Sequence, residues 1–261
     1  MNTNRAALLN LLKSQITIFY ADHHFCGDIP LHSCLTTLID TDASICTSLL
    51  INNYVHQRFS AWAVVGAFGD NLVESARTAA KPLCLTNDQL QKLQQLGICI
   101  NYNAYGSKLD DLHFAPDVLY RILARYPSPL DFIVEQDELY LQLLTAYADD
   151  IHYAETLKPE FNSPHAAVFM LPNEKWAHRV TGVWANELAN RNPDMAHALI
   201  MDNQQGGYQV SVRAPLNNKT GAVELCDKFS TGGGRKAAAG INHLEKGQLS
   251  EFIQAFSLHY H

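Results

Sequence analysis

The segment that most constrains the fold is a short apolar run that ends in three polar residues. Residues 16–21 read Ile-Thr-Ile-Phe-Tyr-Ala, and Asp22, His23 and His24 follow directly. A run of β-branched and aromatic residues of this length predicts a buried strand, and strands without polar alternation are typical of parallel sheets. Ligands of open α/β sheets bind at the carboxyl ends of the strands. The segment therefore predicts an α/β fold with a site near Asp22.

Composition and charge limit the partners of the protein. The chain has 261 residues, of which 47% are hydrophobic, and this suits two modest domains with cores of their own. The formal net charge is −7, so we expect no broad basic face for a long duplex, although a local site for a small anion is allowed. No apolar run approaches the roughly 20 residues of a membrane span. Scattered cysteines without a C-x-x-C pair, and no secretory signal, predict a cytoplasmic protein with reduced thiols.

Hydrophobic periodicity predicts a change of architecture along the chain. Helices are predicted over residues 2–14, 42–59, 60–71, 86–102 and 115–129. Short β-rich runs are predicted over residues 165–172, 197–204 and 208–215, with helices over 181–192 and 249–261. Between these two regions, residues 130–161 are acidic and helical in period, which predicts one long connecting helix. A plain surface helix of a single domain is the alternative.

These elements predict two domains. We expect a parallel-sheet domain over residues 1–130, a helical connector over residues 131–157, and a smaller α+β domain over residues 158–261.

The polar residues after the first strand are candidate metal ligands. Asp22, His23 and His24 place carboxylate and imidazole groups side by side, and this combination suits Mn²⁺, Fe²⁺ or Zn²⁺. The alternative is an aspartate that caps a helix beside two partly exposed histidines. Asp70 offers a second carboxylate after an apolar segment, although Gly-Asp-Asn is also ordinary turn chemistry. The tripeptide alone leaves both interpretations open.

A glycine-rich segment near the end of the chain is a candidate anion site. Residues 230–240 read Ser-Thr-Gly-Gly-Gly-Arg-Lys-Ala-Ala-Ala-Gly. Three consecutive glycines expose backbone N–H groups, and Arg235 and Lys236 add positive charge beside them, which predicts a loop that binds an anion. The spacing is not that of a P-loop. A flexible glycine turn is the alternative.

Two other features are weaker candidates for ligand binding. Ser211 and Arg213 lie two residues apart on a predicted strand and therefore on one face of it, so Arg213 could join the anion site. A solvated strand residue is the alternative for this arginine. The polar, aromatic turn at residues 101–106 could stack a nucleobase, although most such turns are structural.

The order of these motifs resembles the DHH superfamily of phosphoesterases. The resemblance rests on Asp22-His23-His24 after a strand, the later Gly69-Asp70, and the late glycine loop, and it extends over nearly the whole chain. It is greatest for a bacterial subgroup. The superfamily includes single-strand exonucleases, phosphodiesterases of short oligonucleotides and cyclic dinucleotides, and exopolyphosphatase-like enzymes. The resemblance implies a DHH-type domain followed by a DHH-associated domain that binds substrate.

The resemblance also implies roles for individual residues. His23 is expected to ligate metal, with Asp70 as a later carboxylate ligand, and the implied cofactor is a pair of Mn²⁺ ions. Asp22 is expected to orient or bridge the metals and His24 to face the scissile phosphate, which makes both candidate catalytic residues. The residues expected to hold the phosphate of the substrate are Gly232, Gly233, Gly234 and Arg235, with Arg213 as a further candidate. Many relatives have histidine where this chain has Arg235.

One departure from the superfamily concerns the metal ligands. The superfamily opens with a strand that ends in an Asp-x-Asp motif, and the residues before Asp22 include no aspartate. We therefore expect a DHH-type domain without this N-terminal segment, and a metal site that is short of carboxylates.

The resemblance implies a metal-dependent phosphoesterase of the cytoplasm. It would hydrolyse a phosphodiester or phosphoanhydride in a cleft between the two domains. The substrate would be a short oligonucleotide or other short single-stranded nucleic acid, a nucleotide or a polyphosphate. The alternative is a catalytically inactive module that binds an anion or a nucleotide.

Overall fold

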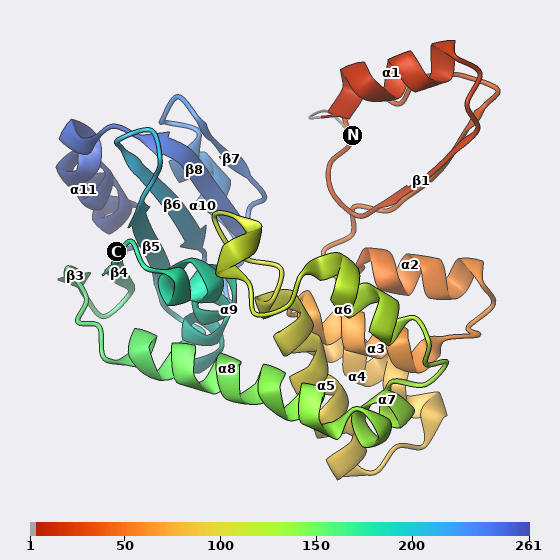
Figure 1. Ribbon diagram of the computed structural model, residues 1–261. Coiled ribbons are helices and arrows are strands. Elements are labelled where there is room, and N and C mark those ends of the chain that lie inside the picture. Colours follow the sequence, from red (N-terminus) through yellow and green to blue (C-terminus); the bar gives the residue numbers. More distant parts are fainter. Residues whose placement is uncertain (1–3) are drawn as a thin grey trace. The chain divides into compact units, whose positions relative to one another are not determined.

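The chain folds into two compact units. The computed structural model describes residues 4–261. Unit 1 comprises Met1–Ile100 and Tyr120–Tyr140, and unit 2 comprises Asn101–Leu119 and Leu141–His261. Figure 1 shows the elements in order along the chain, and three helices (α5, α6 and α8) extend across the sequence boundaries between the units.

Unit 1 is mainly helical. Its elements are α1 (Arg5–Lys13), β1 (Ile18–Asp22), β2 (Leu35–Ile39), α2 (Thr47–Tyr54), α3 (Ser60–Gly69), α4 (Val73–Ala80), a 3₁₀ turn (Lys81–Leu83), most of α5 (Asn87–Tyr102), the end of α6 (Pro116–Leu123), α7 (Pro129–Glu135) and the start of α8 (Asp137–Glu155). The helices and the first strand predicted from periodicity are thus confirmed. Residues 2 and 3 of the first predicted helix lie outside the described residues.

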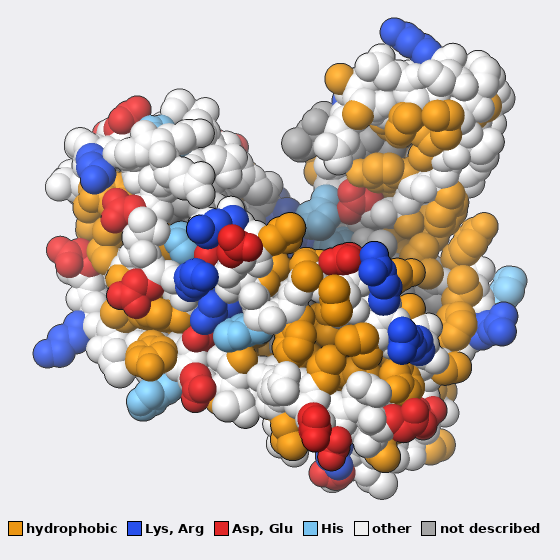
Figure 2. Space-filling model, in the orientation of Figure 1, with side chains coloured by type: hydrophobic (Ala, Val, Ile, Leu, Met, Phe, Trp, Pro, Cys, Tyr) orange, Lys and Arg blue, Asp and Glu red, His pale blue; other side chains and the backbone are white. Residues whose placement is uncertain are grey.

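The first strand of unit 1 has a parallel partner. β1 pairs with β2 in parallel, from Ile18 opposite Leu35 to Asp22 opposite Ile39, so the carboxyl ends of both strands lie at one edge. Helix α1 packs its buried leucines on one face of this sheet. On the other face Phe19 is 44% exposed, and Figure 2 shows hydrophobic side chains on the surface around α1 and β1. The predicted burial of β1 is therefore wrong, because among the described residues β1 has one strand neighbour, and the contact of Phe19 with Tyr54 of α2 covers its second face only in part.

Helices α3 and α5 pack unusually closely, and this contact fixes the end of α3. A Cβ atom added to Gly97 of α5 would lie 2.2 Å from the carbonyl oxygen of Val65 and 2.9 Å from the backbone nitrogen of Gly69. Leu93 and Leu96 of α5 are fully buried. Asp70 follows α3 directly, so this contact between two helix backbones also positions the Asp70 carboxylate.

Unit 2 is built on a six-stranded mixed sheet in the order β3-β4-β5-β6-β8-β7. Only the β4–β5 pair is parallel within this sheet, and the other pairs are antiparallel. Besides the start of α6 and most of α8, its elements are a 3₁₀ turn (Leu109–Asp111), β3 (Phe161–Asn162), β4 (Ala166–Leu171), α9 (Lys175–Arg191), β5 (Ala196–Asp202), β6 (Tyr208–Arg213), α10 (Ala222–Cys226), β7 (Gly232–Gly234), β8 (Ala238–Leu244), a 3₁₀ turn (Lys246–Gln248) and α11 (Leu249–His259). The predicted strands and helices of this region are confirmed.

Strand alternation separates a core face from a polar face on β6. Val210 and Val212 point into a core that also contains Phe252 and Phe256 of α11. The intervening side chains of β6 therefore point to the opposite face of the sheet. Helix α9 packs against β5 and β6. The polar face of β6 carries the cavity described below.

Two element predictions are wrong. Residues 130–161 do not form one long helix, because α7 ends at Glu135, Gln136 takes a non-helical conformation, and α8 begins at Asp137. The predicted glycine loop is the strand β7, which pairs with β8.

The compact units and the predicted domains differ in their bounds. Packing places residues 101–119 in unit 2. The domain boundaries at residues 130 and 157 stay a prediction. Among the described helices, none combines the length and apolar character that crossing a bilayer requires.

Candidate metal and phosphate sites

The Asp-His-His tripeptide lies where β1 ends at the edge of the parallel sheet. Asp22 is the last residue of β1, and the backbone N–H of Asp40, just beyond β2, donates to the carbonyl oxygen of Asp22 at 3.3 Å. The structure thus places Asp40 at the same edge as Asp22. Sequence reasoning had no means to place Asp40 there, because the parallel register of β1 and β2 is a long-range property.

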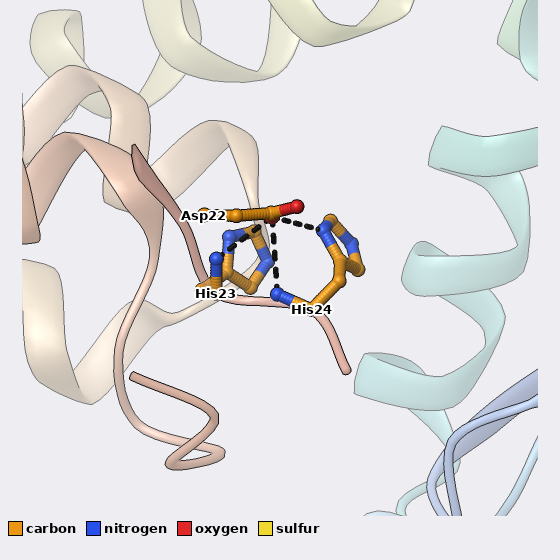
Figure 3. A group of neighbouring side chains, drawn as sticks. All are labelled: Asp22, His23 and His24. Atoms are coloured by element: carbon orange, nitrogen blue, oxygen red, sulfur yellow. Dashed lines mark hydrogen bonds and ion pairs between the residues drawn. The ribbon is translucent and has the colours of Figure 1, made fainter. Parts of the chain in front are cut away.

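Asp22 is the centre of a compact hydrogen-bond cluster (Figure 3). Its Oδ1 accepts hydrogen bonds from the backbone N–H of His23 at 2.8 Å and of His24 at 3.1 Å, and from His24 Nδ1 at 2.8 Å. Its Oδ2 accepts from the Tyr20 hydroxyl at 3.0 Å. Burial raises the pKa of the Asp22 carboxyl, but the hydrogen bonds from His24, Tyr20 and His23 outweigh it and lower this pKa to about 2. Asp22 is therefore an anion at neutral pH.

His23 lies between Asp70 and the start of α2. Its side chain is 8% exposed, and its Nε2 lies 3.3 Å from Asp70 Oδ2. Its Nδ1 lies 3.0 Å from Thr47 Oγ1 and 3.2 Å from the backbone nitrogen of Thr47. Because Nδ1 accepts from the backbone N–H of Thr47, the proton of the neutral ring lies on Nε2, on the side of Asp70, and a metal ion bound at Nε2 would replace this proton. The predicted pair of His23 and Asp70 is brought together.

Three of these residues, Asp22, His23 and His24, form a candidate site for one divalent cation. Ligand atoms of Asp22, His23 and His24 lie within 4.8 Å of one another, and no other such group of three occurs among residues 4–261. They offer two imidazoles and one carboxylate, a donor set that suits Mn²⁺, Fe²⁺ or Zn²⁺, and Asp70 adds a second carboxylate 3.3 Å from His23. A hard divalent ion takes about six ligands, so water or substrate oxygens would complete its shell.

Arg213 lines a cavity in unit 2. The cavity has a volume of about 290 Å³, and its lining includes Arg213, Ser211, Gly240 and Tyr105. The guanidinium donates from Nη1 to Ser211 Oγ at 3.0 Å and from Nε to Asn186 Oδ1 at 3.0 Å. The first contact confirms that Ser211 and Arg213 share a strand face.

The charge of Arg213 has no acidic partner in the described part of the chain, where no carboxylate oxygen lies within 4.0 Å of its guanidinium. Burial lowers the pKa of Arg213, Tyr105 raises it, and the nearby Arg235 lowers it. The cavity therefore combines a cation, a hydroxyl group and an aromatic ring, which together suit an anionic group on an organic ligand.

The glycines predicted to cradle phosphate have structural contacts of their own. Gly232 leaves no room for a side chain, because an added Cβ would lie 1.7 Å from the carbonyl oxygen of Cys226. Gly234 has a φ of +147°, which favours glycine. Arg235 exchanges backbone hydrogen bonds with Ala238 in the hairpin turn. Neither Arg235 nor the three glycines line the Arg213 cavity, so their role as phosphate ligands stays a prediction.

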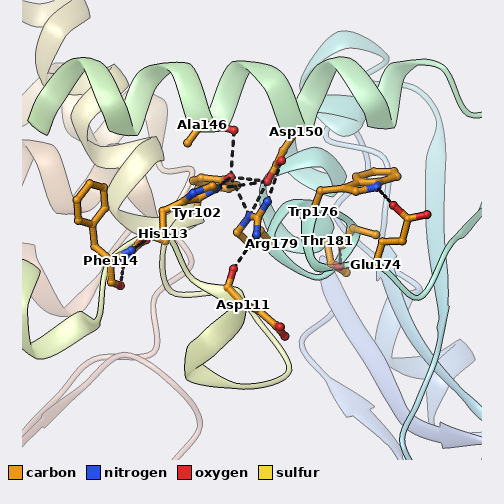
Figure 4. A network of polar contacts seen from close by, with 12 residues as sticks. Tyr102, Asp111, His113, Phe114, Ala146, Asp150, Glu174, Trp176, Arg179 and Thr181 are labelled. Carbon is orange, nitrogen blue, oxygen red and sulfur yellow. Dashed lines mark hydrogen bonds and ion pairs between the residues drawn. The ribbon is translucent and has the colours of Figure 1, made fainter. Parts of the chain in front are cut away.

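A buried polar network in unit 2 was not predicted from the sequence (Figure 4). Arg179 of α9 makes two hydrogen bonds to Asp150 of α8, at 2.6 Å from Nε and 3.0 Å from Nη2, and its Nη1 donates to the carbonyl oxygen of Asp111 at 2.7 Å. The Tyr102 hydroxyl donates to Asp150 as well. The network anchors the segment after α5, which carries Tyr105. No local signal reveals it, because these partners are far apart in sequence.

Comparisons with known proteins find similarity at the level of structure. No protein-family model matches the sequence, and no curated protein matches it. A solved structure described as the DHH domain of a member of a family of ribosomal proteins superposes with a TM-score of 0.62 at 15% identity. This match covers 97% of our chain and 65% of the other, so the chain spans just under two thirds of that protein.

Two further structures are similar. The exonuclease RecJ bound to manganese matches with a TM-score of 0.53 at 19% identity, covering 98% of this chain and 72% of RecJ. The pGpG-specific phosphodiesterase PggH from Vibrio cholerae matches with a TM-score of 0.50 at 14% identity, covering 96% of this chain and 87% of PggH. At these identities the likeness concerns the fold. With its parallel edge, its Asp-His-His tripeptide and these neighbours, the chain has the fold of the DHH superfamily.

Proposed function

We propose that this protein is a metal-dependent phosphoesterase that hydrolyses a phosphodiester or phosphoanhydride. The observation that supports this most directly is the grouping of Asp22, His23 and His24 at the end of a parallel strand, with Asp70 3.3 Å from His23. The neighbours are consistent with it, since RecJ was crystallised with manganese and PggH is described as a phosphodiesterase. The expected cofactor is Mn²⁺, and a second ion would need ligands beyond these four side chains.

The residues of the site have distinct proposed roles. A bound Mn²⁺ ion would polarise a phosphate oxygen and lower the pKa of a coordinated water. His23 and Asp70 would hold the ion, because His23 is buried and its Nε2 is directed toward Asp70. Asp22 stays anionic and fixes His24 through Nδ1, so Nε2 of this largely exposed imidazole would be the atom that contacts substrate. His24 can then exchange a proton with the reacting phosphate group.

Arg213 is the proposed holder of a substrate phosphate in unit 2. Its guanidinium is fixed by Asn186 and Ser211 and lines a cavity without an acidic neighbour. Gly232, Gly233, Gly234 and Arg235 remain further candidates for this role. The proposed substrates are a short single-stranded oligonucleotide, a nucleotide or a polyphosphate.

The test is Mn²⁺-dependent hydrolysis of bis-p-nitrophenyl phosphate. We expect turnover with Mn²⁺, none with a chelator, and loss of both turnover and Mn²⁺ binding in the His23→Ala variant. His165→Ala replaces an exposed histidine of unit 2 and serves as the control, with activity unchanged. Equal Mn²⁺ affinity in wild type and His23→Ala, measured by isothermal titration calorimetry, would contradict the proposed metal site.

The alternative function is a catalytically inactive module that binds an anion or nucleotide. One observation favours it, since the Arg213 cavity lies wholly within unit 2 and is formed without Asp22 or His23. In that case the protein would bind a nucleotide but show neither Mn²⁺ uptake nor hydrolysis in the same assay.

A further inference from the structure

A second cavity continues from the Arg213 cavity within unit 2. Its volume is about 520 Å³. Both cavities are lined by Ser107, His178, Gln209 and Asn242, so they share one wall. A ligand whose phosphate lies against Arg213 can therefore extend across His178 into the second cavity.

The charges along this groove are unevenly distributed. In the first cavity Arg213 is the one charged lining residue. The second cavity is lined by two cations and three carboxylates, namely Lys108, Lys175, Asp111, Glu174 and Asp202. It therefore carries no net positive charge. In the second cavity the attraction of Lys108 and Lys175 for further phosphates is opposed by the three carboxylates, whereas Arg213 meets no carboxylate in the lining of the first cavity.

Amide side chains also line the junction and the second cavity. Four of them, which are exposed and make no side-chain hydrogen bond within residues 4–261, are Gln204, Gln205, Gln209 and Asn242. Gln209 lies on β6 two residues before Ser211 and four before Arg213, so its side chain shares their strand face. The strand rise separates Gln209 from Arg213 by about 13 Å.

His178 is held as a neutral hydrogen-bonding group where the cavities meet. Its Nδ1 lies 2.8 Å from Ser107 Oγ and its Nε2 lies 2.9 Å from Asn173 Oδ1. Burial lowers the pKa of His178, while the charge of Asp111 acts in the opposite direction. The imidazole therefore adds no cation for a second phosphate at neutral pH.

An amide presents a donor and an acceptor side by side, and this pattern matches the edge of a nucleobase. Tyr105 adds an aromatic face, and its ring lies against helix α9 at Gly182, where an added Cβ would be 2.2 Å from Tyr105 Cζ. The groove thus offers an anion-binding group at Arg213, an aromatic ring at Tyr105, and amide side chains beside charged groups of both signs in the second cavity.

We propose that Gln209 and Asn242 form a nucleobase-reading subsite next to the Arg213 phosphate site, so that the ligand of unit 2 is a nucleotide and not a polyphosphate. This inference rests on the proposed function in so far as Arg213 binds the phosphate of the substrate. It narrows the substrate to a phosphate that carries a nucleoside.

The test compares a nucleotide, the same sugar phosphate without its base, and a polyphosphate without a nucleoside. Adenosine 5′-monophosphate, ribose 5-phosphate and tripolyphosphate are titrated into the chelator-treated protein by calorimetry. We expect adenosine 5′-monophosphate to bind about tenfold more tightly than ribose 5-phosphate, the gain from one or two hydrogen bonds to a neutral amide. Tripolyphosphate should bind no more tightly than ribose 5-phosphate.

Alanine variants test whether Gln209 and Asn242 cause the tighter binding of adenosine 5′-monophosphate. The double variant Gln209→Ala/Asn242→Ala should lower the affinity for adenosine 5′-monophosphate about tenfold and leave ribose 5-phosphate unchanged. Both residues are exposed, so we expect the fold to persist. Gln254→Ala, which replaces an exposed glutamine of α11 outside both cavities, should leave all three affinities unchanged.

The outcomes separate this inference from the proposed function. Three outcomes would overturn the nucleobase subsite. Tripolyphosphate could bind as tightly as adenosine 5′-monophosphate or more tightly, or the double variant could lose the same affinity for every ligand. The third is that none of the ligands binds. Hydrolysis of bis-p-nitrophenyl phosphate with Mn²⁺ can still succeed in those cases, and the proposed function then stands. If hydrolysis fails while the double variant lowers nucleotide affinity alone, the subsite stands and the catalytic proposal falls.

Discussion

At the residue scale, the two candidate sites depend on how charged groups are partnered. Asp22 accepts four hydrogen bonds and stays anionic, so it provides a fixed negative charge that can attract a cation. Arg213 is fixed by neutral groups, so its charge remains available to a ligand. Arg179, by contrast, is neutralised by Asp150 in a buried pair and has a structural role.

Asp70→Asn tests the metal site with little change in size. The amide keeps the volume of the side chain but loses the negative charge 3.3 Å from His23 Nε2. We expect the affinity for Mn²⁺ to fall at least about tenfold. Calorimetry with Mn²⁺ measures this, and Asp149→Asn, an exposed carboxylate of α8, is the control that should behave like wild type. An unchanged Mn²⁺ affinity in Asp70→Asn would remove Asp70 from the ligand set.

Asp150→Asn tests the buried pair through stability. The variant leaves the Arg179 guanidinium buried without its anion, so we expect the free energy of unfolding at pH 7 to fall by about 3 kcal/mol. Urea denaturation measures this, and Asp149→Asn should change it by less than about 0.5 kcal/mol.

The contribution of the Asp150 carboxylate to the free energy of unfolding should decrease as the pH falls. Burial raises the pKa of Asp150, but hydrogen bonds from His113, Arg179 and Tyr102 prevail and lower it to about 2. Because the folded pKa lies below the ordinary value of 3.8, this carboxylate stabilises the fold above about pH 4, and the contribution of about 2 kcal/mol is lost as the pH falls through 2. The difference between wild type and Asp150→Asn should therefore narrow between pH 4 and pH 2. A constant difference would contradict the lowered pKa.

At the element scale, β7 shows that a glycine run can serve packing as well as binding. The strand pairs with β8, and the end of α10 approaches Gly232 so closely that no side chain fits. Gly233 lies between its two neighbours in open space, where an added Cβ would meet nothing within 4 Å. The three glycines therefore differ in how much space the fold leaves for a side chain, although the residue type is the same.

Alanine substitutions in β7 separate packing from phosphate binding. We expect Gly232→Ala to lower the free energy of unfolding by about 3 kcal/mol, because its Cβ would overlap backbone atoms. Gly233→Ala should change it by less than about 1 kcal/mol. Thermal or urea denaturation measures both. If Gly233→Ala weakens binding of adenosine 5′-monophosphate while leaving stability unchanged, the predicted phosphate role of the glycines is supported.

At the scale of the whole molecule, each compact unit contains one candidate site. The candidate metal ligands all belong to unit 1, and the groove of Arg213, Gln209 and Asn242 belongs to unit 2. Because each unit has buried side chains of its own, ligand binding to one should first stabilise the elements that form that site.

Hydrogen exchange can test this assignment on the full chain. Saturating Mn²⁺ should increase protection in β1, α2 and the end of α3, where a ligand at 100 times its dissociation constant contributes about 2.7 kcal/mol. Adenosine 5′-monophosphate should increase protection in β6, β8 and the start of α9. Mass spectrometry of peptides from each unit measures both effects. Protection by Mn²⁺ confined to unit 2 would contradict the metal site.

The sequence by itself determined what depends on local order. Apolar periodicity located β1, β4, β5, β6 and most of the longer helices, and the residue types in Asp22-His23-His24 made these residues candidate metal ligands, because both signals are contained in neighbouring residues. The paired position of Ser211 and Arg213 also followed from strand alternation, and their hydrogen bond confirms it.

Only the tertiary structure decided which distant groups meet. It brought Asp40 to the edge of Asp22, joined Asp150 to Arg179, and paired the glycine run with β8 as a strand. It also left β1 half exposed and opened the groove beside Gln209. Strand register, burial and ion pairing depend on contacts between residues far apart in the chain, and local periodicity carries no information about those contacts.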